Sequence, residues 1–294
     1  MMPAREPVVV TPPVLRDWPL PDPGEDKDAR GQVLVVGGSV RTPGAVLLAG
    51  EAALRAGAGE LRLATVESAC PPLGVAVPEA LVVGLPQTRQ GHLDPSAADE
   101  LVELAAGAAT VLFGPGFADP DTTLSLLSAV LPKLECPVVL DALASAYLTE
   151  HPNGLHHLGG RAVVTMNPKE VARIAGIDPA DVLADPASVV AALARSTRAV
   201  MVCGGQEKTI GHPDGDVWVV QGGGPGLGVS GSGDVQAGIV SGLSARGAGP
   251  AQSAVWGAYL HAGAGDRLAA STGSLGFLAR ELPAEVPRML AELA

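Results

Sequence analysis

The sequence has few aromatic side chains and few basic residues, and each shortage excludes a class of protein. Aromatic residues are only 3% of the chain although 47% is hydrophobic, so the core must consist mainly of alanine, valine and leucine. The 19 lysine and arginine residues face 31 acidic residues, which gives a formal charge of −12. A broad nucleic-acid-binding surface needs clustered basic residues, so this acidic charge argues against such a surface.

Cysteines are also scarce, and the chain lacks long apolar runs. The three cysteines, Cys70, Cys136 and Cys203, are odd in number and contain no CxxC pair, which excludes a disulfide framework and gives no support to a zinc site. No apolar run reaches the roughly 18 residues of a membrane span, and prolines interrupt the N-terminal stretch where a signal peptide needs an apolar core. We expect a cytoplasmic protein that has no membrane partner.

Apolar runs alternate with helical stretches along most of the chain. The runs are continuously apolar, as in parallel strands that are buried on both faces, so we predict a three-layer αβα sandwich with a mostly parallel central sheet. Residues 1–30 are rich in proline and charge and are expected to wrap the surface of a single domain over residues 31–294. The predicted strands are residues 33–36, 60–64, 80–84, 110–113, 137–140, 162–165 and 199–202.

The second half of the chain changes its pattern. An antiparallel hairpin is predicted over residues 209–220, because Pro213, Asp214 and Gly215 supply turn chemistry. Amphipathic helices are predicted over 235–246 and 252–268, and the apolar surface after Gln252 is expected to contact a second copy of the chain. Further helices are predicted over 45–56 and 281–294.

The glycine-rich turn at residues 222–234, GGGPGLGVSGSGD, carries the strongest functional signal. Its glycines let a ligand approach the backbone, and a helix start leaves amides unpaired, which makes an anion site. Asp234 lies beside those amides, where a carboxylate is placed to accept a hydroxyl proton during phosphoryl transfer. The alternative interpretation is a flexible loop with a helix-capping aspartate.

Other turns that follow strands give weaker signals. Residues 37–45, GGSVRTPGA, do not form a GxGxxG fingerprint and have no acidic residue about 20 positions on, so a dinucleotide site for hydride transfer is not expected. FGPGF at residues 113–117 is equally consistent with a turn that contacts a ligand and with a tight structural turn.

Polar residues at two further strand ends, and one histidine, are candidates. In TMNPKE, Pro168 and Glu170 are explained as capping devices, which leaves Asn167 to contact a ligand. Asp141 is equally consistent with a solvated strand end and with a ligand near phosphates. His261 is assigned to the core and left out of the site.

Several motifs in order resemble the ADP-dependent NAD(P)H-hydrate dehydratase family of the ribokinase-like superfamily. The resemblance covers residues 12–294 and rests on GQVLVVGGS, PGAVLLAGEAALRAGAG, PEALV, FGPGF, VVLDA, TMNPKE, VSGSGD and GAYLHAGAGD. It implies that ADP, or ATP, drives dehydration of hydrated NADH or NADPH to NADH or NADPH, with release of AMP and phosphate. It further implies a homo-oligomer, with a tetramer as one form. Mg²⁺ is expected because the reaction moves phosphates, and the acidic charge leaves no nucleic-acid partner to expect.

The resemblance also implies roles for particular residues. Asp234 would be the catalytic base and would contact the hydrated cofactor together with Ala45, Gly116 and Asn167. The nucleotide would be bound by Cys203, Gly204, Gly205, Lys208, Thr209, Gly231, Ser232 and Gly233.

The chain departs from the family pattern at several of these positions. Asn167 stands where the family commonly has histidine, and Cys203 where it commonly has lysine, a charge that Lys208 is placed to supply. Asp141 lacks the second carboxylate of the usual DADAL, and Gly224 replaces a frequent asparagine. Two alternatives therefore stay open: an ATP-dependent kinase of a small hydroxylated metabolite, and a nucleotide-binding homologue without catalysis.

Overall fold

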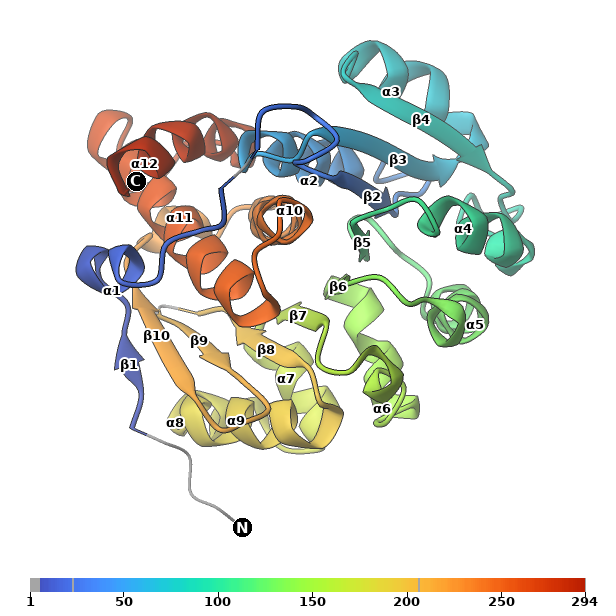
Figure 1. Ribbon diagram of the computed structural model, residues 1–294. Coiled ribbons are helices and arrows are strands. Elements are labelled where there is room, and N and C mark those ends of the chain that lie inside the picture. Colours follow the sequence, from blue (N-terminus) through green and yellow to red (C-terminus); the bar gives the residue numbers. More distant parts are fainter. Residues whose placement is uncertain (1–5, 23, 206, 294) are drawn as a thin grey trace.

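The strands of the computed structural model form one ten-stranded sheet (Figure 1). The structure describes residues 6–22, 24–205 and 207–293. The strand order is β1-β10-β9-β8-β7-β6-β5-β2-β3-β4. In chain order the strands are β1 (Val8–Val9), β2 (Gln32–Val36), β3 (Glu60–Val66), β4 (Ala80–Leu85), β5 (Thr110–Phe113), β6 (Val138–Asp141), β7 (Ala162–Met166), β8 (Val200–Cys203), β9 (Glu207–Gly211) and β10 (Val217–Gln221).

The sheet is mostly parallel, which confirms the predicted fold class. Among the strands of the described residues, only β9 runs antiparallel to its neighbours, and it forms the expected hairpin with β10. Every residue of β2, β5, β6, β7 and β8 is buried. These strands need apolar side chains on both faces, which explains their continuous apolar runs.

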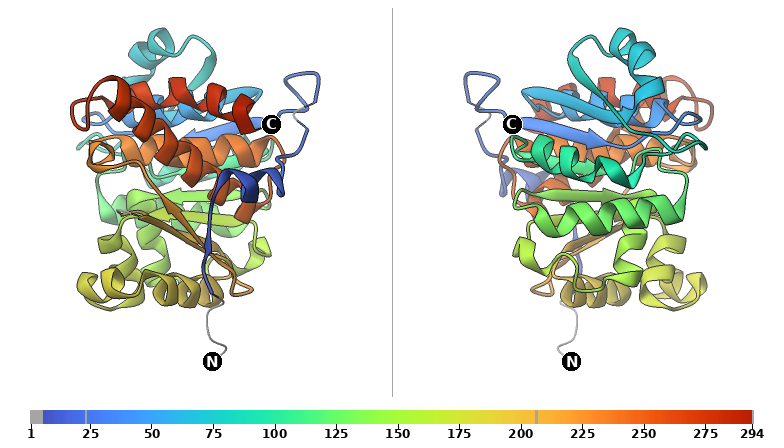
Figure 2. Two further views of the ribbon diagram at one scale, coloured as in Figure 1. Left: turned by 90° about the vertical axis from the view of Figure 1, so that its left-hand side faces the viewer. Right: turned by 90° about the vertical axis from the view of Figure 1, so that its right-hand side faces the viewer.

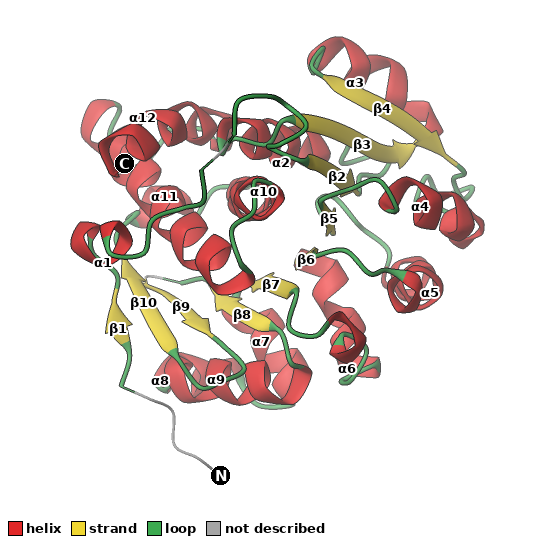
Figure 3. Ribbon diagram, viewed as in Figure 1, coloured by secondary structure: helices red, strands yellow, loops and turns green. Residues whose placement is uncertain are grey.

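Helices cover both faces of the sheet, as the red ribbons on either side of the yellow strands show (Figure 3). One layer holds α2 (Gly44–Arg55), α10 (Ser232–Ala245), α11 (Pro250–Ser271) and α12 (Val286–Leu293). The other holds α4 (Ala98–Ala105), α5 (Pro120–Val130), α6 (Tyr147–Glu150), α7 (Pro168–Ala175), α8 (Pro179–Ala184) and α9 (Pro186–Thr197). Helix α3 (Cys70–Ala76) packs on β4. Short 3₁₀ helices span Glu67–Ala69, Pro95–Ala97, Leu131–Lys133, Ala142–Ala146, His156–Leu158 and Pro225–Leu227.

Helices cover nearly all of the predicted ranges 235–246 and 252–268, but both helices are largely buried, so the amphipathic character predicted for them is wrong. Helix α10 lies between α2, α11 and the sheet, so nearly all of its residues are buried. Its glycines permit this close packing: a Cβ at Gly238 would lie 2.1 Å from the carbonyl oxygen of Ala49 on α2. The apolar side chains of α11 are likewise buried within the chain, so they are not free to contact a second copy.

The N-terminal segment does more than wrap the surface. Strand β1 extends the sheet by pairing in parallel with β10, and Leu15 on α1 (Pro12–Arg16) is fully buried. The indole of Trp256 donates a 3.0 Å hydrogen bond to the carbonyl oxygen of Trp18, whose ring stacks on Trp218 at 5.8 Å between centroids. Figure 2 shows this segment (blue) crossing the molecule beside the C-terminal helices (red). The segment therefore contributes to the core.

The C-terminal tail is not one helix over 281–294 as predicted. A 3₁₀ helix, Ala279–Glu285, contains Pro283 and precedes α12, since a proline cannot donate the backbone hydrogen bond of an α-helix interior. Ala294 lies outside the described residues.

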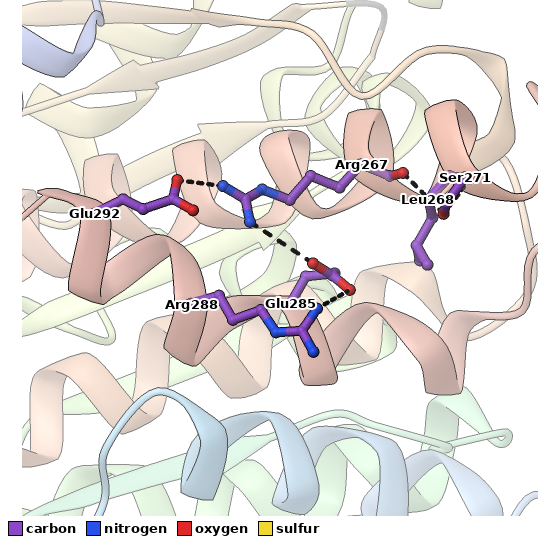
Figure 4. Close-up of polar contacts among 6 residues, drawn as sticks. All are labelled: Arg267, Leu268, Ser271, Glu285, Arg288 and Glu292. Carbon is purple, nitrogen blue, oxygen red and sulfur yellow. Dashed lines mark hydrogen bonds and ion pairs between the residues drawn. The ribbon is translucent and has the colours of Figure 1, made fainter.

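Ion pairs join this tail to α11 (Figure 4). The Arg267 guanidinium contacts the carboxylates of Glu292 and Glu285, and Arg288 lies 3.8 Å from Glu285. Because each pair lies at the surface and includes a side chain that is at least one-third exposed, each stabilises the fold by about 1 kcal/mol or less. Their role is to orient the tail, while buried residues such as Leu282 and Val286 supply most of the packing.

Candidate active site

A cavity of about 1000 Å³ opens at the carboxyl ends of β6, β7 and β8, where α10 begins. This is the edge of a parallel sheet at which α/β proteins bind ligands. The volume is large for a binding pocket and accommodates a nucleotide. Acidic, basic and amide groups from several segments line it.

The first turn of α10 presents free backbone amides to the cavity. Gly231 precedes the helix with φ of 91°, a left-handed conformation that favours glycine. The N–H of Ser232 donates to the carbonyl of Val229 at 3.2 Å, whereas no described residue accepts a hydrogen bond from the N–H of Gly233 or Asp234. Two free amides at a helix N-terminus form an anion site. Of the predicted amides at residues 231–233, that of Ser232 is therefore bonded within the turn, whereas that of Gly233 is free.

Asp234 lies in that first turn and lines the cavity. Its side chain is half-buried, and this burial raises the pKa of Asp234 to about 7. A carboxylate with a pKa near neutral pH is a stronger base than an exposed one and still loses its proton under physiological conditions.

Asp141 ends β6 and faces the same cavity. It is 5% exposed, and its Oδ1 accepts a 2.6 Å hydrogen bond from the hydroxyl of Thr165 on β7. Burial, and then the nearby charge of Asp234, raise the pKa of Asp141 to about 8. The next residue, Ala142, has φ of 48°, a left-handed conformation that alanine rarely adopts and that is common at functional sites.

A lysine, a histidine and a serine form the opposite wall. Lys208 on β9 is 4% exposed, and burial lowers the pKa of its ammonium group to about 8. The buried His261 on α11 lies 2.9 Å (Nε2 to Oγ) from Ser232 at the start of α10. Burial, and then the charge of Lys208, lower the pKa of His261 well below its usual value, so the imidazole is neutral. This wall thus holds one buried cation beside the free amides.

Comparison with known proteins identifies the family. The sequence profile of NAD(P)H-hydrate dehydratase matches residues 33–288. The ADP-dependent (S)-NAD(P)H-hydrate dehydratase of Xanthomonas campestris is 46% identical over 97% of this chain and 96% of its own length. The chain belongs to the NAD(P)H-hydrate dehydratase family.

Two further relatives are similar to this dehydratase-family chain, one in structure and one in sequence. A structure of the ADP/ATP-dependent NAD(P)H-hydrate dehydratase of Bacillus subtilis, co-crystallised with ATP and Mg²⁺, superposes with a TM-score of 0.80 at 26% identity and covers 99% of this chain and 100% of that one. The bifunctional NAD(P)H-hydrate repair enzyme of Moorella thermoacetica is 36% identical over 91% of this chain, which spans half of that longer protein. The fold is ribokinase-like, because a ribokinase-like superfamily protein of Enterococcus faecalis superposes with a TM-score of 0.79 at 24% identity over 98% of this chain and 96% of that one.

The structure assigns Asn167 a different task from the one expected in this dehydratase-family site. Its Oδ1 accepts hydrogen bonds from the N–H groups of Lys169 (2.9 Å) and Glu170 (3.1 Å), and Glu170 accepts from the N–H of Asn167. This reciprocal capping box starts α7. The expectation that only a ligand explains Asn167 is therefore wrong, although the residue also lines the cavity.

The remaining predicted residues divide into two groups. Gly204, Gly205, Lys208 and residues 231–233 line the cavity together with Asp234. Four do not line it: Cys203, Thr209, Ala45 and Gly116. The thiol of Cys203 is turned toward the carbonyl oxygen of Gly204 at 3.5 Å, and burial raises its pKa to about 11, so it is neutral.

Ala45 and Gly116 meet each other on neighbouring turns outside the cavity lining. A Cβ built on Gly116 would lie 3.0 Å from the Cβ of Ala45, and the carbonyl of Gly116 accepts a 2.8 Å hydrogen bond from Thr42. The turns at 37–45 and 113–117 therefore form one unit beside the ends of β2 and β5.

His261, which was assigned to the core, lines the cavity, and so does Asp141, which was equally consistent with a solvated strand end. No pattern in GAYLHAGAGD distinguishes a histidine that lines a cavity from one in the core, because the surrounding helix is apolar in both cases. For Asp141 a signal was available: it ends a buried strand and pairs with Thr165, one residue before the end of the next strand.

Proposed function

We propose that this protein is an ADP-dependent (S)-NAD(P)H-hydrate dehydratase. It returns hydrated NADH or NADPH to NADH or NADPH and releases AMP and phosphate. The observation that carries the proposal is Asp234, a half-buried carboxylate beside two free amides, inside a cavity of about 1000 Å³. Support comes from the Xanthomonas relative, which carries this name and matches along almost its whole length.

The reaction needs phosphorylation before water can leave. Hydroxide is a poor leaving group because the pKa of water is about 15.7, and transferring a phosphoryl group to the ring hydroxyl gives a much better one. Asp234 accepts the hydroxyl proton while the amides of Gly233 and Asp234 stabilise charge on the moving phosphoryl group. The raised pKa of Asp234, about 7, suits a base at neutral pH.

Nucleotide and substrate occupy different parts of the strand-end edge in this proposal. The nucleotide phosphates lie against Gly204, Gly205 and residues 231–233, with Lys208 supplying the charge that the neutral Cys203 lacks. Thr209 is buried and pairs with Cys203 in the sheet, next to this region. The hydrated cofactor extends from Asp234 and Asn167 toward the turns of Ala45 and Gly116.

Mg²⁺ is expected with the nucleotide. Across residues 6–22, 24–205 and 207–293, no group of three or more His, Cys, Asp or Glu side chains is arranged to hold a metal. A protein usually contacts Mg²⁺ through one or two carboxylates while substrate phosphates and water complete the shell. Here the nucleotide phosphates and water would make most of the contacts to the ion, which would neutralise phosphate charge.

We further propose a cytoplasmic homo-oligomer, a tetramer being one form to test. No helix in the described part of the chain combines the length and hydropathy needed to cross a bilayer. Since α11 is buried, the contacts between copies lie elsewhere on the surface. Light scattering coupled to size-exclusion chromatography measures the number of copies.

The decisive assay mixes purified protein with hydrated NADPH and either ADP or ATP. Dehydration restores the near-ultraviolet absorbance of reduced nicotinamide with equimolar inorganic phosphate, and Asp234→Asn should abolish it while leaving the circular dichroism spectrum unchanged. A stable phosphate ester without restored absorbance would identify a metabolite kinase instead. Nucleotide binding without turnover of either kind would identify a homologue that lacks catalysis.

A further inference from the structure

Restoring the nicotinamide ring requires two proton transfers, and the proposed function assigns only one. Phosphorylation removes the hydroxyl proton, which Asp234 accepts. Elimination then removes phosphate from one ring carbon and a proton from the adjacent carbon. A general base within reach of the bound ring contributes roughly 10²- to 10⁴-fold to such a step. The cavity therefore needs a second acceptor on the side where the ring lies.

Asp141 occupies that side of the cavity. It ends β6, between β5, which leads into Gly114 and Gly116, and β7, which leads into Asn167. These neighbours belong to the substrate half of the strand-end edge, whereas the nucleotide half begins at β8. The turn after β5 lies directly against Asp141, because a Cβ at Gly114 would lie 1.9 Å from the Asp141 carbonyl oxygen.

The carboxyl group of Asp141 is held in a fixed orientation. The Thr165 hydroxyl donates a 2.6 Å hydrogen bond to Oδ1, and the side chain is 5% exposed yet lines the cavity. The left-handed φ of 48° at Ala142 turns the chain away immediately after the carboxylate. A buried acidic group that is aimed into a cavity and held by strained backbone is costly for the fold, which indicates a chemical role.

We propose that Asp141 is the second catalytic base, which accepts the proton from the ring carbon adjacent to the phosphorylated carbon. The C–O bond to phosphate breaks as the lone pair of the ring nitrogen forms a C=N bond. The C–H bond on the adjacent carbon then breaks, its electrons form the C=C bond, and the nitrogen recovers its lone pair. The proton passes to the Asp141 carboxylate, and the products are the reduced nicotinamide and phosphate.

The two carboxylates act in order because the charge of Asp234 acts on Asp141. The negative charge of Asp234 contributes to the raised pKa of Asp141. Once Asp234 has accepted the hydroxyl proton it is neutral, so this repulsion disappears and Asp141 ionises more readily. The first proton transfer therefore prepares the base for the second.

The test measures phosphoryl transfer and elimination separately in the variant Asp141→Asn. This inference rests on the proposed dehydratase activity, so the wild-type protein is assayed first with ADP and hydrated NADPH. It should release AMP and form NADPH in equal amounts. In rapid-quench experiments, Asp141→Asn should still release AMP at a rate within a few-fold of wild type, while NADPH formation falls by about 100-fold or more. AMP would thus accumulate without NADPH.

Controls distinguish this chemical role from a structural one. Asp234→Asn should lose AMP release and NADPH formation together. Thr165→Val, which removes only the hydrogen bond to Asp141, should weaken NADPH formation more than AMP release. Equal amounts of AMP and NADPH in Asp141→Asn, at any rate, would overturn the assignment while leaving the dehydratase activity in place. Absence of NADPH with the wild-type protein would instead refute the proposed function.

Discussion

Replacing Asp141 with asparagine should stabilise the protein, and the gain should grow with pH. Asp141 is a buried acid whose pKa rises from 3.8 to about 8 on folding. The unfolded chain therefore releases this proton at a lower pH than the folded chain does. Between these two values, each rise in pH favours the unfolded state, so the wild-type protein loses stability that the neutral asparagine retains.

The size of the stability gain follows from the pKa shift of Asp141. Each pH unit within this interval changes the free energy of unfolding by about 1.36 kcal/mol, so the cost of Asp141 grows by about 4 kcal/mol between pH 5 and pH 8. Water in the open cavity solvates the carboxylate and reduces this figure, so we expect an increase of about 2 to 4 kcal/mol. Asparagine keeps the shape of the side chain and still accepts the Thr165 hydrogen bond.

Urea unfolding followed by circular dichroism measures the effect at pH 5, 6, 7 and 8. The stability difference between Asp141→Asn and wild type should widen steadily over this series. Glu103→Gln, on the exposed face of α4, controls for the loss of one carboxylate. A difference that stays constant from pH 5 to 8 would show that folding does not raise the pKa of Asp141, and the argument from burial would fail.

Three further predictions concern the base, the phosphate ligand and the helix packing. Because burial raises the pKa of Asp234 to about 7, kcat/KM should be retained above that pH and fall about tenfold per unit below it, which a pH–rate profile tests. Lys208→Met should raise the KM for ADP by about 10- to 100-fold, and wild-type affinity for ADP should weaken above pH 8 as the ammonium group loses its proton; unchanged titration curves would contradict this. Gly238→Ala should destabilise the fold by about 3 kcal/mol in urea, since its Cβ would meet the Ala49 carbonyl oxygen, whereas Gly107→Ala has open space and should not.

Local sequence determined the sheet, because each buried parallel strand must be apolar on both faces. The runs at 33–36, 110–113 and 162–165 therefore identified strands β2, β5 and β7 without knowledge of their neighbours. The same holds for the glycine-rich turn before α10, where glycine was needed for the left-handed Gly231 and for close approach of a ligand. These are properties of single segments.

Helix burial was decided by packing that no single segment reveals. Helices α10 and α11 consist mainly of small and apolar residues, and their few polar positions were interpreted as a solvent face. In the structure those polar groups are satisfied internally, as when Gln252 donates to the Trp18 and Pro19 carbonyl oxygens. The partners are more than 200 residues apart in the chain, so periodicity gave no sign of them.

The sequence by itself determined the glycine-rich turn before α10 and the carboxylate of Asp234 beside its amides. Only the tertiary structure brought Lys208 and His261 into the same wall and placed Asp141 beside Asp234. The tertiary structure also shows that the side-chain oxygen of Asn167 accepts hydrogen bonds from the first backbone N–H groups of α7. The physical reason is that burial and the approach of charges from distant segments set the protonation of a group, and neither exists in the unfolded chain.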